Sequence, residues 1–172
     1  MIRILIADGH KKFSEALCKI LSTDPLLEVV GISSSSAAAV PMARTEHADI
    51  IFIDSNGHPL ESVEATKKIL AGTHAKVIAL STYTDPIYAG NMLMAGARGY
   101  ITKNSPAAEI IEAVKEVAAG HLYLCNESKG LVKPVLIPVA PQRKPMRVIR
   151  DTTRDLIKTV EMHWHHIFKI AN

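Results

Sequence analysis

Short apolar segments alternate with helical segments from the first residues to about residue 124, and this alternation limits the possible folds more than any other feature. Five apolar runs have the length of strands, and they span 2–7, 27–32, 49–53, 76–80 and 98–102. Between them, apolar residues recur at helical spacing. Such alternation with short connections is typical of a parallel sheet covered by helices on both faces. The sequence therefore predicts an α/β fold with a five-stranded, doubly wound parallel sheet.

Two of the expected helices carry prolines that bear on where they begin. Ser105 followed by Pro106 is typical of a cap residue and a first helical position. The segment over about 36–47 conflicts with a regular helix, because Pro41 removes a backbone donor and clashes with the preceding turn. We therefore expect this helix to begin nearer Ala38, so that the proline lies in its first turn.

Polar and charged side chains stand where four of the strands end. Asp8 and Asp54 follow the first and third strands, and Ser81 and Lys103 follow the fourth and fifth. The carboxyl ends of parallel strands share one edge of the sheet, where sites form. Carboxylates there bind hard divalent cations, a hydroxyl and an ammonium hold phosphoryl oxygens, and an aspartate can act as a nucleophile. Each residue alone has a structural explanation, such as a helix cap or a solvated lysine, but their coincidence favours a site.

These segments resemble the receiver domain of two-component response regulators, most closely that of LuxR-type regulators. The resemblance covers residues 2 to about 124. Its matching stretches are "IRILIADGH", "LEVVGISSSS", "DIIFIDSN", "EATKKI", "VIALSTY", "AGARGYITK" and "AAGHLYL". The resemblance implies a flavodoxin-like receiver that acts in phosphorelay signalling and not as a turnover enzyme.

The resemblance also implies roles for six residues at the expected site. They are Asp54 as phosphoacceptor, Asp8 as one of the acidic pair that binds Mg²⁺, Asn56 as donor of a backbone carbonyl to the metal, Ser81 as switch hydroxyl, Tyr100 as switch aromatic and Lys103 as phosphate contact. Mg²⁺ is the implied cofactor, with Asp8, Asp54 and Asn56 as its ligands.

The chain departs from the family pattern where the second acid of the pair should stand. Gly9 follows Asp8, so the site loses one negative charge and one ligand. Mg²⁺ demands near-ideal octahedral geometry and gives up its waters reluctantly, so we expect weak binding and impaired phosphorylation of Asp54. His10 is not expected to replace the acid, because histidine is common at that place in LuxR-type receivers. The alternative is a fully phosphorylatable regulator in which Gly9 is tolerated.

A second class of function fits the start of the same motif. Cobalamin-binding modules of this fold carry Asp-x-His-x-x-Gly after the first strand, and Asp8, Gly9 and His10 match its beginning. Phe13 stands where the motif has glycine, and the next helix is expected to begin at once. These differences disfavour a cofactor loop.

The chain divides into an expected receiver domain over 1–124, a proline-rich linker over 125–149 and a C-terminal amphipathic helix over 150–172. The prolines of the linker favour an extended segment. The apolar stripe of the helix consists of Leu156, Ile157, Val160, Trp164, Ile167 and Phe168. No helix-turn-helix output domain is recognisable in this region.

Three roles remain open for this C-terminal region. It can dock on its own receiver, pair with another subunit or partner, or bind nucleic acid or a membrane surface. The last role rests on charge, since residues 126–172 hold nine Lys/Arg against four Asp/Glu, whereas residues 1–125 hold eleven against thirteen. The histidines at 163, 165 and 166 are expected to be solvated, because no acid or cysteine accompanies them as a metal ligand.

The expected partners are a sensor histidine kinase or phosphotransfer protein and a second copy of the chain. A homodimer could form through the C-terminal helix or through the face of the fourth helix, fifth strand and fifth helix. We assign Tyr88, Asn91, Met92 and Glu109 to that face. No apolar run approaches the roughly 20 residues of a membrane span and no signal peptide is evident, so the expected location is the cytoplasm.

Overall fold

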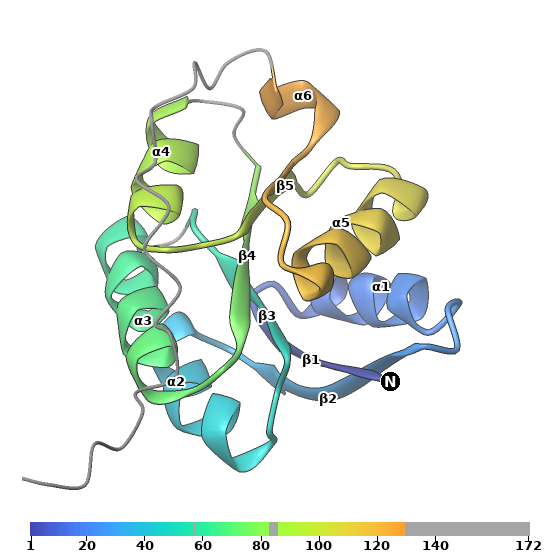
Figure 1. The fold of residues 1–172 in the computed structure, drawn as a ribbon, viewed down its shortest axis with the longest axis horizontal. Helices are drawn as coiled ribbons and strands as arrows, with labels where there is room; N and C mark the ends of the chain where they lie inside the picture. Colours follow the sequence, from blue (N-terminus) through green and yellow to red (C-terminus); the bar gives the residue numbers. More distant parts are fainter. Residues whose placement is uncertain (57, 83–85, 130–172) are drawn as a thin grey trace, which may run out of the picture. The chain divides into compact units, whose positions relative to one another are not determined.

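The computed structural model describes residues 1–56, 58–82 and 86–129, which build one parallel sheet (Figure 1). The strand order is β2-β1-β3-β4-β5-β6, and every neighbouring pair is parallel. The strands are β1 (Ile2–Ala7), β2 (Leu27–Ser33), β3 (Ile50–Asp54), β4 (Lys76–Ser81), β5 (Gly99–Thr102) and β6 (Tyr123–Leu124). The prediction of a doubly wound α/β fold is confirmed.

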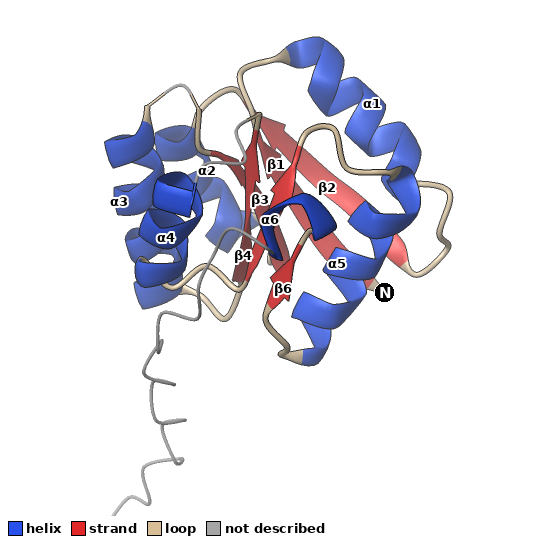
Figure 2. Cartoon of the chain, turned by 90° about the horizontal axis from the view of Figure 1, so that it is seen from above, coloured by secondary structure: helices blue, strands red, loops and turns tan. Residues whose placement is uncertain are grey.

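Helices cover both faces of this sheet (Figure 2). They are α1 (Lys11–Leu21), α2 (Ser36–Thr45), α3 (Pro59–Gly72), α4 (Pro86–Met94), α5 (Ala107–Ala119) and α6 (Asn126–Lys129). One core cluster joins β-strand residues to α1 and α5, through side chains such as Leu17 and Val114. The other joins the sheet to α2, α3 and α4, through Ala39, Ile69 and Ala89. The central strands are apolar toward both faces because both faces are covered.

The sheet has six strands in the described residues, where the sequence predicted five. The additional strand, β6, pairs its Tyr123 with Gly99 and its Leu124 with Tyr100 of β5. Two residues are too few to form an apolar run of the kind from which the other five strands were predicted.

Helices α2 and α5 begin at different residues from those expected. Helix α2 starts at Ser36, and the Ser35 hydroxyl accepts a hydrogen bond of 3.1 Å from the backbone N–H of Ala38. Pro41 therefore lies beyond the first turn, inside the helix. The carbonyl that its missing N–H would have bonded belongs to Ala37, which is exposed and can be hydrated. In α5, Pro106 occupies the cap position and not the first helical one.

The predicted C-terminal boundaries fall largely outside the described residues. Cys125, the first residue of the linker expected over 125–149, is fully buried, and residues 126–129 after it form α6. The rest of the linker and the helix expected over 150–172 lie beyond the last described residue. Within the described part of the chain, no helix combines the length and the apolar character that crossing a membrane requires.

Candidate functional site: a buried acidic pair bridged by a lysine

The ends of β1 and β3 bring two carboxylates together. Asp8 directly follows β1, and Asp54 is the last residue of β3, the neighbouring strand. The Asp8 side chain is fully buried and the Asp54 side chain is 10% exposed. The hydroxyl of Ser62 on α3 donates a hydrogen bond of 2.7 Å to the Asp54 carbonyl, which anchors the strand end to the helix. Register and helix packing thus place both acids at one edge of the sheet.

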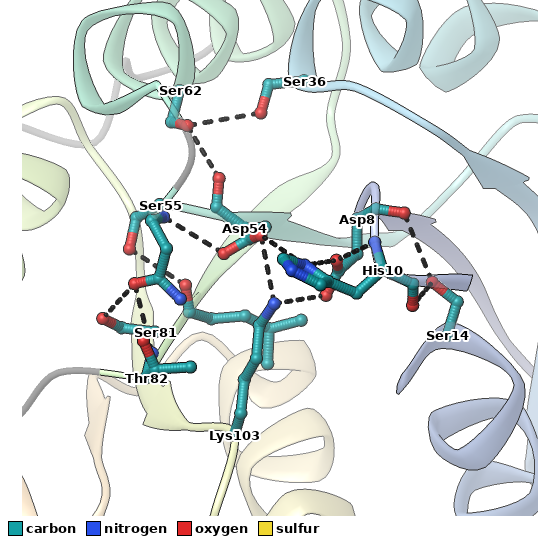
Figure 3. A network of polar contacts seen from close by, with 12 residues as sticks. Asp8, His10, Ser14, Ser36, Asp54, Ser55, Ser62, Ser81, Thr82 and Lys103 are labelled. Atoms are coloured by element: carbon teal, nitrogen blue, oxygen red, sulfur yellow. Dashed lines mark hydrogen bonds and ion pairs between the residues drawn. The ribbon is translucent and has the colours of Figure 1, made fainter. Parts of the chain in front are cut away.

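Lys103 bridges the two acids (Figure 3). Its Nζ lies 2.7 Å from Oδ2 of Asp8 and 3.0 Å from Oδ2 of Asp54. The lysine side chain is 8% exposed, and its ammonium also lies 4.9 Å from the centre of the Phe13 ring on α1. A buried ammonium between two carboxylates offsets part of their mutual repulsion.

His10 also points into this cluster, which the sequence analysis did not foresee (Figure 3). Its Nδ1 lies 3.2 Å from Oδ1 of Asp8 and 3.7 Å from Oδ2 of Asp54. The His10 backbone N–H donates to the same Asp8 oxygen at 2.7 Å. The side chain is 71% exposed, so it covers the solvent side of the acids. The available signal was its position two residues after the acid, just before α1.

Asn56 links Asp54 to the end of β4. Its backbone N–H donates to Oδ1 of Asp54 at 3.1 Å. Its side-chain oxygen accepts from the Ser81 hydroxyl at 2.9 Å and from the Thr82 backbone N–H at 3.1 Å. The expected role of Asn56 concerned its backbone carbonyl; the side-chain link to Ser81 was not foreseen. Ser81 therefore belongs to the same polar network as Asp54, through one intervening residue.

Tyr100 occupies a different place from the acids. Its side chain is fully buried in the core cluster under α2, α3 and α4, which also contains Ala89 and Met92. The structure therefore brings Asp8, Asp54 and Lys103 into direct contact, connects Ser81 through Asn56, and packs the ring of Tyr100 against the helices.

Gly9 contributes no side chain at this edge. A Cβ built on Gly9 would lie 3.2 Å from the carbonyl oxygen of Ser34, so a side chain there requires a shift of a few tenths of an ångström. Two buried carboxylates face one ammonium, and no third acid stands beside them among the described residues. The Asp54 carboxylate thus lies beside a buried ammonium, and it is the more exposed of the two acids.

A match to a protein family identifies the kind of protein in which this acidic site lies. Residues 4–115 match the model of the response regulator receiver domain. The chain belongs to this family. The receiver is thus a module of two-component, phosphorelay signalling, and the family match together with α1 beginning right after His10 disfavours the cobalamin-binding alternative.

Relatives of the receiver are regulators of the LuxR and NarL kind. The transcriptional regulatory protein DegU of Brevibacillus brevis is 36% identical over 124 residues, covering 72% of this chain and 52% of that protein. The response regulator UvrY of Escherichia coli K12 is 30% identical over 128 residues, covering 74% of this chain and 59% of that protein. The chain thus spans between half and three-fifths of the length of these two relatives.

A solved structure shows the same fold as the receiver. The signal receiver domain of the putative response regulator NarL from Mycobacterium tuberculosis superposes with a TM-score of 0.66 at 25% identity. The match covers 70% of this chain and 98% of that one.

The predicted contact face of the receiver is partly wrong. Met92 is 1% exposed and Glu109 is 7% exposed, so neither is available to a partner. Met92 packs against the sheet, and the Glu109 carboxylate accepts a hydrogen bond of 2.8 Å from the backbone N–H of Asn126, the first residue of α6. Asn91 is exposed and Tyr88 is half-buried.

Proposed function

We propose that this chain is an atypical response regulator, whose acidic site holds Mg²⁺ weakly and which acts mainly through protein–protein contacts as a signalling module without catalytic turnover. The observation that carries the proposal is the pairing of Asp8 with Gly9. Among the described residues, two carboxylates offer oxygens at the strand ends, and Lys103 contacts both of them. A cation must compete with this internal ammonium while gaining one carboxylate fewer than the family supplies.

The residues retained at the site support a phosphoryl transfer at a reduced rate. In that transfer an oxygen of Asp54 would bond to phosphorus as the donor's bond to phosphorus breaks. Lys103, at 3.0 Å from the carboxylate, is placed to hold a phosphoryl oxygen. Ser81 would turn its hydroxyl from Asn56 toward the new group.

Asp8 and Asp54 are the residues that would hold Mg²⁺. The bound ion would supply positive charge beside the phosphoryl oxygens. Such electrostatic stabilisation, together with positioning, provides most of the catalysis of phosphoryl transfer. The ion prefers six oxygen ligands, and a glycine at position 9 supplies none through its side chain.

Phosphorylation by acetyl phosphate tests the proposal. With Mg²⁺ present, the native chain is expected to label at Asp54 slowly or not at all. Gly9→Asp should raise both Mg²⁺ affinity and the labelling rate, because it restores a carboxylate. Gly9→Asn is the matched control, since it meets the Ser34 carbonyl at the same distance but adds no charge.

Rapid stoichiometric labelling of the native chain would contradict the proposal and establish the fully phosphorylatable alternative. The observation that favours this alternative is the intact contact of Asp54 with Lys103. Equal effects of the Asp and Asn variants would assign any gain to an added oxygen ligand or to a backbone shift, and not to the missing negative charge.

The proposal also includes partners and location. It places the chain in the cytoplasm with a phosphodonor, either a sensor histidine kinase or a phosphotransfer protein. Homodimerisation is proposed through the helix α4 face, now defined by its exposed residues Ile87, Asn91 and Met94, or through the C-terminal region.

A further inference from the structure

The side chains of Asp8, His10 and Asp54 bring an imidazole nitrogen close to two carboxylates. A Mg²⁺ site built from oxygen ligands has no need of this nitrogen. One atom from each lies within 4.8 Å of the other two. We infer that this site prefers a borderline transition-metal dication, such as Co²⁺ or Zn²⁺, over Mg²⁺, with His10 Nδ1 as its third ligand. The inference rests on the proposed weak binding of Mg²⁺ at the same site and adds which ion is bound instead.

The spacing of the three groups suits a common ion. Neighbouring atoms bound to one Zn²⁺ at about 2.0–2.2 Å lie roughly 2.8–3.6 Å from one another in tetrahedral or octahedral geometry. His10 Nδ1 is 3.2 Å from Oδ1 of Asp8 and 3.7 Å from Oδ2 of Asp54. Binding requires the tautomer of His10 in which Nδ1 carries no proton, so the ion would replace the present hydrogen bond of 3.2 Å between Nδ1 and Asp8.

The chemistry of the ligands sets the preference. Imidazole nitrogen suits zinc, copper, nickel and cobalt, whereas Mg²⁺ favours carboxylate, carbonyl and water oxygens. Replacing the usual second acid with Gly9 removes a hard ligand and leaves the neighbouring His10 as the side chain that closes the site. The exchange lowers the affinity for Mg²⁺ and raises the relative affinity for a metal that accepts nitrogen.

Charge and burial supply an independent reason to expect a cation. The Asp8 side chain is fully buried, the Asp54 side chain is nine-tenths buried, and Lys103 is the one buried cation that contacts them among the described residues. With His10 neutral, the cluster keeps a net negative charge in a poorly solvated place, which is costly.

Lys103 leaves room for such an ion at Asp8. It contacts Oδ2 of Asp8, whereas His10 faces Oδ1 of the same carboxylate. The lysine and the proposed ion therefore use different oxygens of Asp8. At Asp54 both approach Oδ2, so the ion must share that oxygen or displace the ammonium.

Titration of the full-length chain with Co²⁺ and with Mg²⁺ tests the inference. Visible absorption measures Co²⁺ binding and shows whether a nitrogen coordinates the ion. Competition with bound Co²⁺ measures the affinities for Zn²⁺ and Mg²⁺. All variants carry alanine at His163, His165 and His166, so that the C-terminal histidines do not contribute. The parent protein, which carries these three alanines and no other change, should bind Co²⁺ at least about tenfold more tightly than Mg²⁺. His10→Ala should weaken Co²⁺ binding by about tenfold or more and leave Mg²⁺ binding within about twofold.

Two further variants sharpen the test. His121→Ala is the matched control, because His121 is also largely exposed and also contacts a carboxylate, that of Glu116, at 2.8 Å. It should change neither affinity. His10→Asp should lower the ratio of Co²⁺ to Mg²⁺ affinity, since it makes the ligand set all oxygen.

The inference is overturned if His10→Ala leaves the Co²⁺ affinity and spectrum unchanged, or if His121→Ala weakens binding equally. Circular dichroism confirms that each variant is folded. Failure here is distinct from failure of the proposed function. Rapid Mg²⁺-dependent labelling of Asp54 contradicts that function whatever the Co²⁺ result, whereas an unchanged Co²⁺ titration contradicts only the role of His10.

Discussion

The ammonium of Lys103 stands where two neighbouring carboxylates would otherwise repel each other away from water. Its distances of 2.7 and 3.0 Å to Asp8 and Asp54, and its burial, make it a structural as well as a chemical residue. Removing one member of a buried ionic cluster leaves the others uncompensated, which costs far more than the loss of a surface pair.

Replacing Lys103 with methionine is therefore expected to lower the free energy of unfolding by about 3–5 kcal/mol, measured by urea denaturation. Lys68→Met is the control, because Lys68 and Glu64 form a pair on α3 whose side chains are 65% and 70% exposed. That variant should change stability by about 0.5 kcal/mol or less. Similar losses in both variants would show that the buried acids do not depend on the lysine.

The sequence predicted which residues reach this edge, but not all of their contacts. Asp8, Asp54, Ser81 and Lys103 could be placed because parallel strands end at one edge of the sheet. The contact of His10 with both acids depends on its rotamer and on where α1 begins, and neither has a sequence pattern of its own.

At the scale of elements, the first turn of α2 depends on its cap. The Ser35 hydroxyl satisfies one of the free N–H groups, that of Ala38. Ser35→Ala should lower the free energy of unfolding by about 1 kcal/mol in a denaturant titration. Ser34→Ala should have little effect, since Ser34 is an exposed residue before the cap. Equal effects would contradict the capping role.

Tyr123 anchors strand β6, and its titration should make the free energy of unfolding depend on pH. Burial of the hydroxyl, together with its hydrogen bond of 3.0 Å to the Glu112 carboxylate, raises the pKa of Tyr123 above its usual 10.0. The unfolded chain releases this proton at lower pH than the folded one. The stabilisation is therefore fully present below the usual pKa, and the free energy of unfolding should fall as the pH rises above that value.

Urea denaturation at about pH 8 and about pH 11 measures this loss. Tyr123→Phe should show a smaller loss between the two values than the native chain. Tyr88→Phe, at a half-buried tyrosine of α4, should leave the loss unchanged. A loss of the same size in the Tyr123 variant would assign it to other groups.

Helices and strands long enough to show an apolar pattern could be predicted from the sequence, whereas shorter elements could not. The apolar pattern identified the five longer strands. It did not reveal β6, whose two residues owe their conformation to pairing with β5. Nor did the pattern show that α2 continues through Pro41. The carbonyl left without a helical donor belongs to Ala37, an exposed residue, and this exposure could not be predicted from the sequence.

At the scale of the whole molecule, association through α4 predicts opposite outcomes for neighbouring residues. Ile87 and Met94 are 67% and 78% exposed, and Asn91 lies between them at helical spacing. Ile87→Asp and Met94→Glu should keep the fold and weaken self-association in sedimentation. Met92→Asp should unfold the protein, because it places an unpaired charge in the core. If the exposed substitutions change no interaction, the contact face lies elsewhere.

The roles expected for residues 150–172 stay predictions, since this part lies outside the described chain. Its apolar stripe was readable from sequence, but a stripe alone does not say which surface covers it. The same limit explains the errors at Met92 and Glu109, whose burial depends on the packing of α4 and on the start of α6.

The two margins of the sheet restrict how copies of this molecule can meet. On one side β6 already occupies the hydrogen-bonding groups of β5, and β6 itself is only two residues long. On the other side β2 carries a bulge at Val30, which no β1 residue opposes, and the charged residue Glu28. Short, bulged or charged margins resist the addition of a foreign strand. The sheet built by the described residues thus offers little template for fibril growth or strand exchange, which leaves helix surfaces as the route for reversible assembly.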